Sequence, residues 1–183
     1  IKSNNNKLIR REKKMEAIVY TSNTGTTKEY AKLLSDKLSL PYYSLDEIEY
    51  KVKPGSKIIY LGWIIASGVK GYKKVVKDYN VRAVCAVGMG ATGTQVKEVR
   101  TKNKIPSSIP VFTLQGGFDV KKLHGIYKIM MTIMVKTAGK GLANKQDRTQ
   151  EEDQMLEMML HGGKYVDEKN LKAILDWYGK RGE

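Results

Sequence analysis

Short apolar runs alternate with stretches of helical periodicity along most of this chain. The runs are four to seven residues long and rich in β-branched side chains, which is typical of strands. Predicted strands cover residues 17–20, 41–45, 57–63, 82–87 and 111–115. Predicted helices cover residues 26–38, 71–79, 119–136, 149–162 and 167–179. Because strands and helices alternate, the sequence predicts an α/β fold built on a parallel sheet.

The loop after the first strand gathers small hydroxyl residues around one glycine. It consists of Ser22, Asn23, Thr24, Gly25, Thr26 and Thr27. Thr26 and Glu29 have the spacing of a capping box, which predicts that a helix begins there. A helix N-terminus favours an anion, and hydroxyl and backbone donors without Lys or Arg suit a phosphate bound by neutral groups. The alternative is a Ser/Thr-rich capped turn that binds no ligand.

This strand–loop–helix segment resembles the FMN-phosphate loop of the flavodoxins. The resemblance implies a three-layer sandwich around a five-stranded parallel sheet of order 2-1-3-4-5, with FMN at the switch point between strands one and three. It also implies two further flavin loops at the same edge of the sheet. The second holds Trp63, Ile64, Ile65, Ala66, Ser67 and Gly68, and the third holds Gly88, Met89, Gly90, Ala91 and Thr92. Trp63 is expected either to stack on the flavin ring or to be a partly buried core residue.

The third loop also spells G-x-G-x-x-G over residues 88–93, a spacing found in dinucleotide-binding folds. That fingerprint requires an acidic residue near the end of the next strand, and here the strand ends in Gln115 followed by two glycines. The segment 94–104 is also too polar to pack a helix tightly on the sheet. We therefore predict a flavin loop here rather than an NAD site.

The chain after the fifth strand is longer than the single helix that a flavodoxin needs. Within 119–136, apolar residues recur at helical spacing: Leu123, Ile126, Tyr127, Met130, Met131 and Met134. Together with Gln115-Gly116-Gly117 before it and the Lys-Thr-Ala-Gly of 136–139, this region resembles the quinone-dependent protoporphyrinogen dehydrogenases. These are FMN enzymes of haem synthesis. The resemblance implies an inserted amphipathic helix after strand five, and a porphyrinogen substrate whose electrons pass to quinone.

Two interpretations of this methionine-rich stripe stay open. In the first, it packs on the domain as part of the core. In the second, it forms a surface for lipid, a quinone or a protein partner, because methionine adapts to irregular apolar partners. The flanking lysines suit anionic headgroups, so the second interpretation predicts weak, salt-sensitive attachment of residues 119–136 to anionic membranes.

The composition limits the cellular compartment and the kinds of partner that we expect for this protein. We expect residues 15–183 to form a single domain and 1–14 to be a disordered basic arm or upstream sequence. The net charge is +14, but no aromatic residue interleaves with the basic residues of the arm, so we expect no nucleic-acid partner. The lone Cys85 lies in an apolar run, which predicts a buried, inert thiol. No secretory or spanning segment is evident, so we expect a cytoplasmic protein, at most peripheral to the inner face of the membrane.

These features together predict an FMN-binding redox protein of the flavodoxin type, with a redox partner or a quinone or other small molecule as substrate. No paired carboxylates and no Ser/His/Asp or Cys/His set appear, so we expect the cofactor to supply the chemistry. Two alternatives are a protoporphyrinogen-type dehydrogenase that passes electrons to quinone and a flavin-free interaction module. Basic residues close to the second and third loops favour an electron-accepting enzyme, since their field stabilises a reduced, anionic flavin. They are Lys70, Lys73, Lys74, Lys97 and Arg100.

Overall fold

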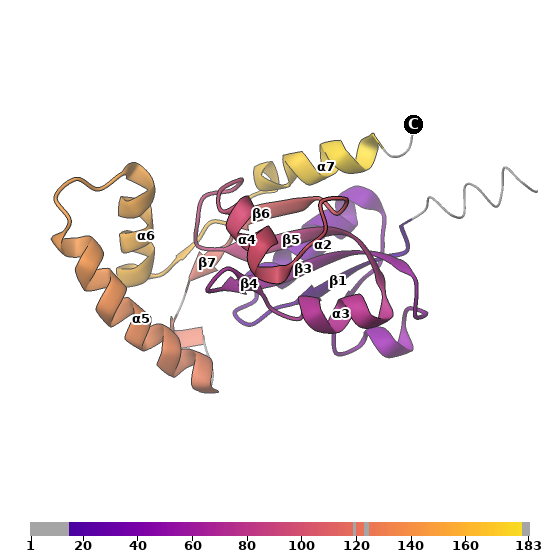
Figure 1. Ribbon diagram of the computed structural model, residues 1–183, viewed down its shortest axis with the longest axis horizontal. Coiled ribbons are helices and arrows are strands. Elements are labelled where there is room, and N and C mark those ends of the chain that lie inside the picture. Colours follow the sequence, from indigo (N-terminus) through magenta and orange to yellow (C-terminus); the bar gives the residue numbers. More distant parts are fainter. Residues whose placement is uncertain (1–14, 119, 123–124, 181–183) are drawn as a thin grey trace, which may run out of the picture.

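The computed structural model describes residues 15–118, 120–122 and 125–180. The expectations for the segment 1–14, for Leu123, and for the side chains of Ile126, Tyr127 and Met130 lie outside what it describes. The parallel sheet consists of β1 (Ala17–Thr21), β2 (Tyr42–Ser44), β3 (Lys57–Ile65), β5 (Asn80–Gly88) and β6 (Val111–Gln115). Its order, β2-β1-β3-β5-β6, confirms the predicted 2-1-3-4-5 topology. The sheet is flanked by α2 (Thr26–Leu38), α3 (Tyr72–Asp78), α4 (Val96–Asn103) and α7 (Lys172–Gly179) (Figure 1).

The central strands are buried on both faces, which explains why β3 reads as an almost unbroken apolar run. Ile58 and Tyr60 belong to a core that includes residues of α3 and α4, whereas Ile59 and Leu61 belong to a core that includes residues of α2 and α7. All of these side chains are fully buried. Cys85 lies in the second core, and burial raises the pKa of its thiol, in keeping with the predicted inert thiol.

The buried side chain of Tyr60 hydrogen-bonds the backbone just after the short strand β4 (Gly68–Val69). The Tyr60 hydroxyl donates to the Lys70 carbonyl oxygen at 2.6 Å and lies 2.7 Å from the Thr21 hydroxyl. Because the single tyrosine proton goes to the carbonyl, Thr21 donates. Gly71 lies against this pair with a φ of 83°, and a Cβ there would be 2.0 Å from the Tyr60 oxygen. Only glycine fits this position without displacing Tyr60.

The predicted capping box at the start of α2 does not form. The N-cap of α2 is Gly25, in the left-handed conformation with a φ of 100°, and no side chain caps the helix. The Glu29 carboxylate lies instead 2.9 Å from Lys164 Nζ. The prediction was wrong because the loop turns through Gly25, which moves the helix boundary by one residue and removes Thr26 from the capping position.

Helix α4 occupies the segment that sequence analysis wrongly judged too polar for a packed helix. Val99 is fully buried, and the buried Asn103 makes three hydrogen bonds. Its Nδ2 donates to the carbonyl oxygens of Ser67 at 2.8 Å and Val99 at 2.7 Å, and its Oδ1 accepts from the Val69 N–H at 2.8 Å. The fully hydrogen-bonded side chain of Asn103 therefore fixes the position of α4. The pattern of apolar residues in the sequence does not reveal these hydrogen bonds.

The region after β6 forms a helical hairpin that stands beyond one end of the sheet (Figure 1). It comprises the turn η2 (Val120–Lys122), α5 (Gly125–Asn144) and α6 (Gln150–His161), joined to the domain by the antiparallel strands β7 (Gly117–Phe118) and β8 (Gly163–Lys164). Helix α5 therefore continues to Asn144, past residue 136, where the sequence predicted that the helix ends. In α6 the buried residues are Met158 and Met159, whereas Met155 and Leu156 are only partly buried. No helix in the described part of the chain is long and apolar enough to cross a membrane.

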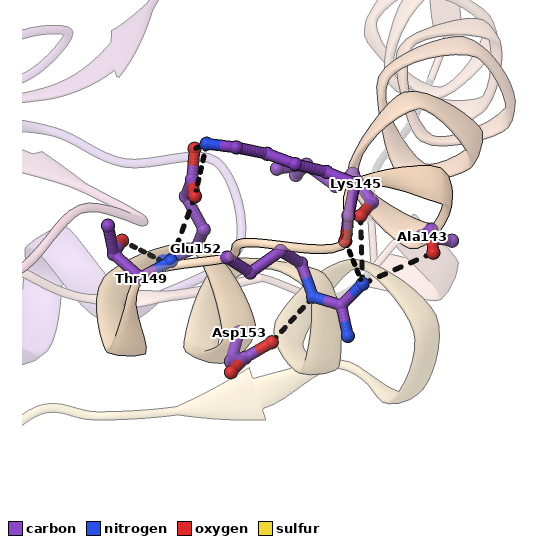
Figure 2. A network of polar contacts seen from close by, with 7 residues as sticks. Ala143, Lys145, Thr149, Glu152 and Asp153 are labelled. Atoms are coloured by element: carbon purple, nitrogen blue, oxygen red, sulfur yellow. Dashed lines mark hydrogen bonds and ion pairs between the residues drawn. The ribbon is translucent and has the colours of Figure 1, made fainter.

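Polar contacts close the turn between α5 and α6 (Figure 2). Thr149 and Glu152 form the predicted capping box, and Lys145 Nζ lies 2.6 Å from the nearer Glu152 carboxylate oxygen. Arg148 donates to three carbonyl oxygens at the end of α5 and to Asp153 at 2.6 Å. These bonds satisfy carbonyl groups that a helix end leaves without partners, so the turn itself holds the hairpin together.

We predict that Gly71→Ala lowers the free energy of unfolding by about 2–4 kcal/mol, through left-handed strain plus overpacking against Tyr60. Gly55→Ala is the matched control, because Gly55 has a φ of 81° and nothing lies within 4 Å of its Cβ position. In this control, left-handed strain alone should lower the free energy of unfolding by about 1 kcal/mol. Urea unfolding followed by circular dichroism measures both variants. An equal loss of unfolding free energy in the two variants would show that the Tyr60 side chain moves aside without an energetic penalty.

Candidate functional site

The loop between β1 and α2 holds buried polar groups that the protein leaves unpaired. Gly25 turns the chain, and its N–H donates to Ser22 Oγ at 3.2 Å. Thr27 Oγ1 and Asn23 Nδ2 are among the few buried side-chain polar atoms of the described residues that have no hydrogen-bond partner. Each such atom costs about 1–3 kcal/mol. Two of them in one loop at a helix N-terminus indicate a place for a polar ligand.

The second loop is a strained two-residue hairpin between β3 and β4. Ile65 pairs with Gly68, and the intervening Ala66 and Ser67 have φ values of 46° and 60°. Consecutive left-handed residues occur in type I′ turns, where Asn and Gly are preferred, so Ala and Ser cost of order 1 kcal/mol each. Asn103 holds the Ser67 carbonyl in place. Strain of this kind is often found at functional sites.

The third loop follows β5 and is tied to the end of β6. Thr92 Oγ1 accepts from the Gln115 N–H at 2.9 Å, and the Gly88 carbonyl accepts from the Gly116 N–H at 2.8 Å. Helix α4 does follow this loop, as a dinucleotide fingerprint would require. However, β6 ends in Gln115 where that fingerprint needs an acid. The choice of a flavin loop over an NAD site stays a prediction.

The three loops meet around one cavity of about 280 Å³ beyond the carboxyl ends of β1, β3 and β5. The predicted residues that line it are Asn23, Thr24, Thr26, Thr27, Trp63, Ile64, Ile65, Ala66, Ser67, Gly88, Met89 and Gly90. The predicted residues that do not line it are Ser22, Gly25, Gly68, Ala91 and Thr92. Ser22 and Thr92 make hydrogen bonds within and between the loops instead. The fold thus gathers most of the predicted residues from all three loops.

The hairpin adds methionines that sequence analysis did not assign to the site. Met131 and Met134 of α5 and Met155 of α6 line the cavity together with residues of the loops. We call these three residues the methionine wall. The outward side of α5 instead exposes Ile129 and Ile133, whose side chains are 62% and 57% exposed. The helical spacing of the methionines was the sequence signal that could have assigned them to the site. This spacing indicates an adaptable apolar surface, but it does not show which part of the molecule that surface packs against. Val87, Gln95 and Gly117 line the cavity as well.

No charged side chain of the described residues lines this cavity. Lys70 Nζ lies 5.9 Å from the centroid of the Trp63 ring, within cation–π range. Arg100, which was expected to add to a basic field around the loops, donates to the carbonyl oxygens of Pro106 and Ile109 at 2.6 and 2.9 Å. Its guanidinium group is therefore hydrogen-bonded to the segment after α4. The cavity offers neutral donors and apolar surface.

A family model described as "Flavodoxin domain" matches residues 17–144, well over half of the chain. The chain belongs to the flavodoxin domain family. The match contains all three loops and reaches the last residue of α5, whereas α6, β8 and α7 lie beyond it. Searches of the curated proteins and of the solved structures returned no match.

Membership in the flavodoxin domain family points to a flavin-binding redox function. The donor set agrees with such a ligand on physical grounds. A flavin cofactor has a phosphate that matches the unpaired polar atoms of the first loop and an aromatic ring that matches the surface around Trp63.

Proposed function

We propose that this flavodoxin domain binds FMN in the cavity between its three loops and transfers electrons through it. The observation that carries this proposal is the pair of buried, unpaired polar atoms, Thr27 Oγ1 and Asn23 Nδ2. Both residues line the cavity at the start of α2, where a helix N-terminus favours a phosphate. A turn with only a structural role would have these groups paired, which argues against a flavin-free interaction module.

The residues of the cavity divide into those that bind the phosphate and those that surround the ring. Hydroxyl and backbone groups of 22–27 would hold the phosphate, and Trp63 would stack against the ring. Backbone groups of 65–68 and 88–92 would meet the polar edge of the ring. When bound, FMN takes up and releases electrons, which is the chemistry that the chain itself lacks. The methionine wall would exclude water from the apolar side of the cavity.

We predict opposite effects of Thr27→Val on stability and on cofactor binding. Without flavin, the variant should be more stable by about 1 kcal/mol or unchanged, because an unpaired buried hydroxyl is removed. Its FMN affinity should fall by about 10- to 100-fold, the value of one charge-assisted hydrogen bond. Urea unfolding of the flavin-free protein and quenching of FMN fluorescence measure the two quantities.

Thr113→Val is the matched control for this substitution. Thr113 is also buried, but its hydroxyl donates to the Thr94 carbonyl oxygen at 2.6 Å. The control should lose about 1–2 kcal/mol of stability, because it leaves that carbonyl without its partner. Its FMN affinity should stay near that of the wild type. An unchanged FMN affinity in Thr27→Val, or the absence of FMN binding by the wild type, would contradict the proposal.

The methionine wall favours a second, more specific function on the same cofactor. It lines the apolar side of the cavity with flexible side chains, which suits a bulky, largely apolar molecule better than a protein partner that docks directly against the flavin. A protoporphyrinogen-type dehydrogenase that passes electrons to quinone meets this description. In this candidate, FMN accepts electrons from a reduced organic molecule and passes them to the quinone.

We predict that the double variant Met131→Gln/Met134→Gln loses turnover while keeping FMN. With a porphyrinogen as reductant and an apolar benzoquinone as oxidant, kcat/KM should fall about tenfold, because polar side chains replace two apolar contacts. The control is Ile129→Gln/Ile133→Gln, the same kind of change on the outward side of α5. A wild type that binds FMN but turns over no such pair would reject this candidate and leave the FMN proposal intact.

The outward side of α5 supports a weak contact with an anionic membrane surface. Ile129 and Ile133 are exposed one turn apart, and Lys136 and Lys140 continue the same stripe and are exposed as well. Exposed apolar side chains among lysines suit the boundary between anionic headgroups and acyl chains. The membrane contact proposed for this region therefore uses the isoleucines, while Met131 and Met134 face the cavity.

We predict that the protein sediments with anionic vesicles at low salt and is released at high salt. Lysines near such a surface contribute about 1 kcal/mol each, and salt screens this attraction. Ile129→Gln/Ile133→Gln should weaken binding about tenfold, whereas Met131→Gln/Met134→Gln should bind like the wild type. Equal sedimentation of the two variants, or equal binding to neutral vesicles, would show that the stripe does not contact lipid.

A further inference from the structure

The side-chain amide of Asn103 bridges two backbone groups of the second loop. Its Nδ2 donates to the Ser67 carbonyl oxygen at 2.8 Å, and its Oδ1 accepts from the Val69 N–H at 2.8 Å. These two groups belong to alternate residues and lie along one edge of β4, whose other edge pairs with β3. The amide therefore occupies the place that the peptide group of a neighbouring strand would take.

The turn that Asn103 bonds consists of residues that do not favour its conformation. Ala66 and Ser67 have positive φ values, as the two central residues of a type I′ turn do. An Asn-Gly pair adopts this turn readily, whereas a residue with an ordinary Cβ is strained there. Strained backbone persists only where the surrounding structure holds it. The amide of Asn103, which bonds Ser67 directly, supplies part of that hold.

Helix α4 fixes the amide in place. Asn103 is the last residue of α4 and only 8% exposed, and its Nδ2 also donates to the Val99 carbonyl oxygen at 2.7 Å. Val99 is itself fully buried. Arg100 donates to the carbonyl oxygens of Pro106 and Ile109, which ties the end of the helix to the following segment. The amide is thus held by its own helix and does not depend on the turn for its orientation.

The turn lies on the wall of the cavity between the three loops, whereas Asn103 does not. Ala66 and Ser67 line the cavity, and so does Gln95, the N-cap residue of α4. Helix α4 therefore reaches the cavity directly at its N-terminal end and through the bonded turn at its C-terminal end. A substitution at Asn103 affects a ligand in the cavity through the backbone that it holds.

We propose that Asn103 is a positioning residue for cofactor binding, which holds the turn of Ala66 and Ser67 in the left-handed conformation that forms the cavity wall. That the ligand is FMN rests on the proposed function, whereas the hold on the turn rests on the hydrogen bonds. Without the amide, the strained turn relaxes, and the conformation that binds the cofactor becomes a minor fraction of the population. The apparent affinity falls by that fraction.

A double-mutant cycle on FMN affinity tests this role. Asn103→Leu keeps the number and branching of the heavy atoms and removes the hydrogen bonds, while Ala66→Asn/Ser67→Gly gives the turn residues that favour it. Asn103→Leu should weaken FMN binding about tenfold with the natural turn, but less than about threefold in the Ala66→Asn/Ser67→Gly background. Quenching of FMN fluorescence measures the four affinities. Equal losses in the two backgrounds, or no loss with the natural turn, overturn the proposal.

Val99→Ala is the matched control on the same helix. It removes buried apolar atoms of α4 and leaves the side chain of Asn103 unchanged. The control should lose stability in urea unfolding but bind FMN within about twofold of the wild type. A loss of FMN affinity as large as that of Asn103→Leu would assign the effect to general loosening of α4 and overturn the proposal. Asn103→Ser, too short to bridge both backbone groups, replaces Asn103→Leu in the cycle if the latter does not fold.

Nuclear magnetic resonance of the flavin-free protein tests the hold on the turn without any cofactor. A residue with positive φ gives a strong nuclear Overhauser effect between its own N–H and Hα protons. The wild type should show this signal at residue 66, Asn103→Leu should weaken it, and the Ala66→Asn/Ser67→Gly background should restore it. An unchanged signal in Asn103→Leu overturns the proposal. A wild type that binds no FMN contradicts the proposed function, and this measurement then still decides whether Asn103 positions the turn.

Discussion

The site depends on a close approach at Gly116 and Gly117, where β6 leaves the sheet and the hairpin begins. A Cβ on Gly116 would lie 2.6 Å from Val87 Cγ1, and one on Gly117 would lie 2.5 Å from the Gly163 carbonyl oxygen. The Gly116 N–H also donates to the Gly88 carbonyl oxygen at 2.8 Å. The third loop and both strands at the base of the hairpin therefore meet at two residues without side chains. A larger residue there would push the methionine wall away from the loops.

The hydroxyl of Tyr30 joins this junction to α2, the helix that follows the first loop. Tyr30 of α2 donates to the Gln115 carbonyl oxygen at 2.5 Å and accepts from Asn170 Nδ2 at 2.6 Å. Burial raises the pKa of Tyr30, so the hydroxyl keeps its proton and remains a donor near neutral pH. The end of β6, the start of α2 and the chain that returns from the hairpin are thus held in one arrangement, which keeps the binding groups preorganised.

Charged side chains are distributed unequally between the two sides of the loop formed by residues 22–27. No charged side chain of the described residues lines the cavity between the three loops, which becomes apolar toward the methionine wall, whereas Lys121, Lys122, Lys164 and Glu29 line a second cavity on the other side of Thr24 and Thr26.

The sequence by itself determined the strands and the loop after β1, because buried parallel strands and helix starts leave local patterns in the chain. The strand order and the other two loops were expected from the resemblance to the flavodoxins. The sequence did not determine the N-cap at Gly25 or the anchoring of α4 by Asn103, since each depends on backbone conformation or on hydrogen bonds to distant loops. Only the tertiary structure decided that Met131 faces the cavity while Ile129 faces outward. It alone placed Lys122 beside Thr24 and Thr26 of the first loop. The physical reason is that the direction a helix faces is set by the segments that pack against it, and here those segments are remote in sequence.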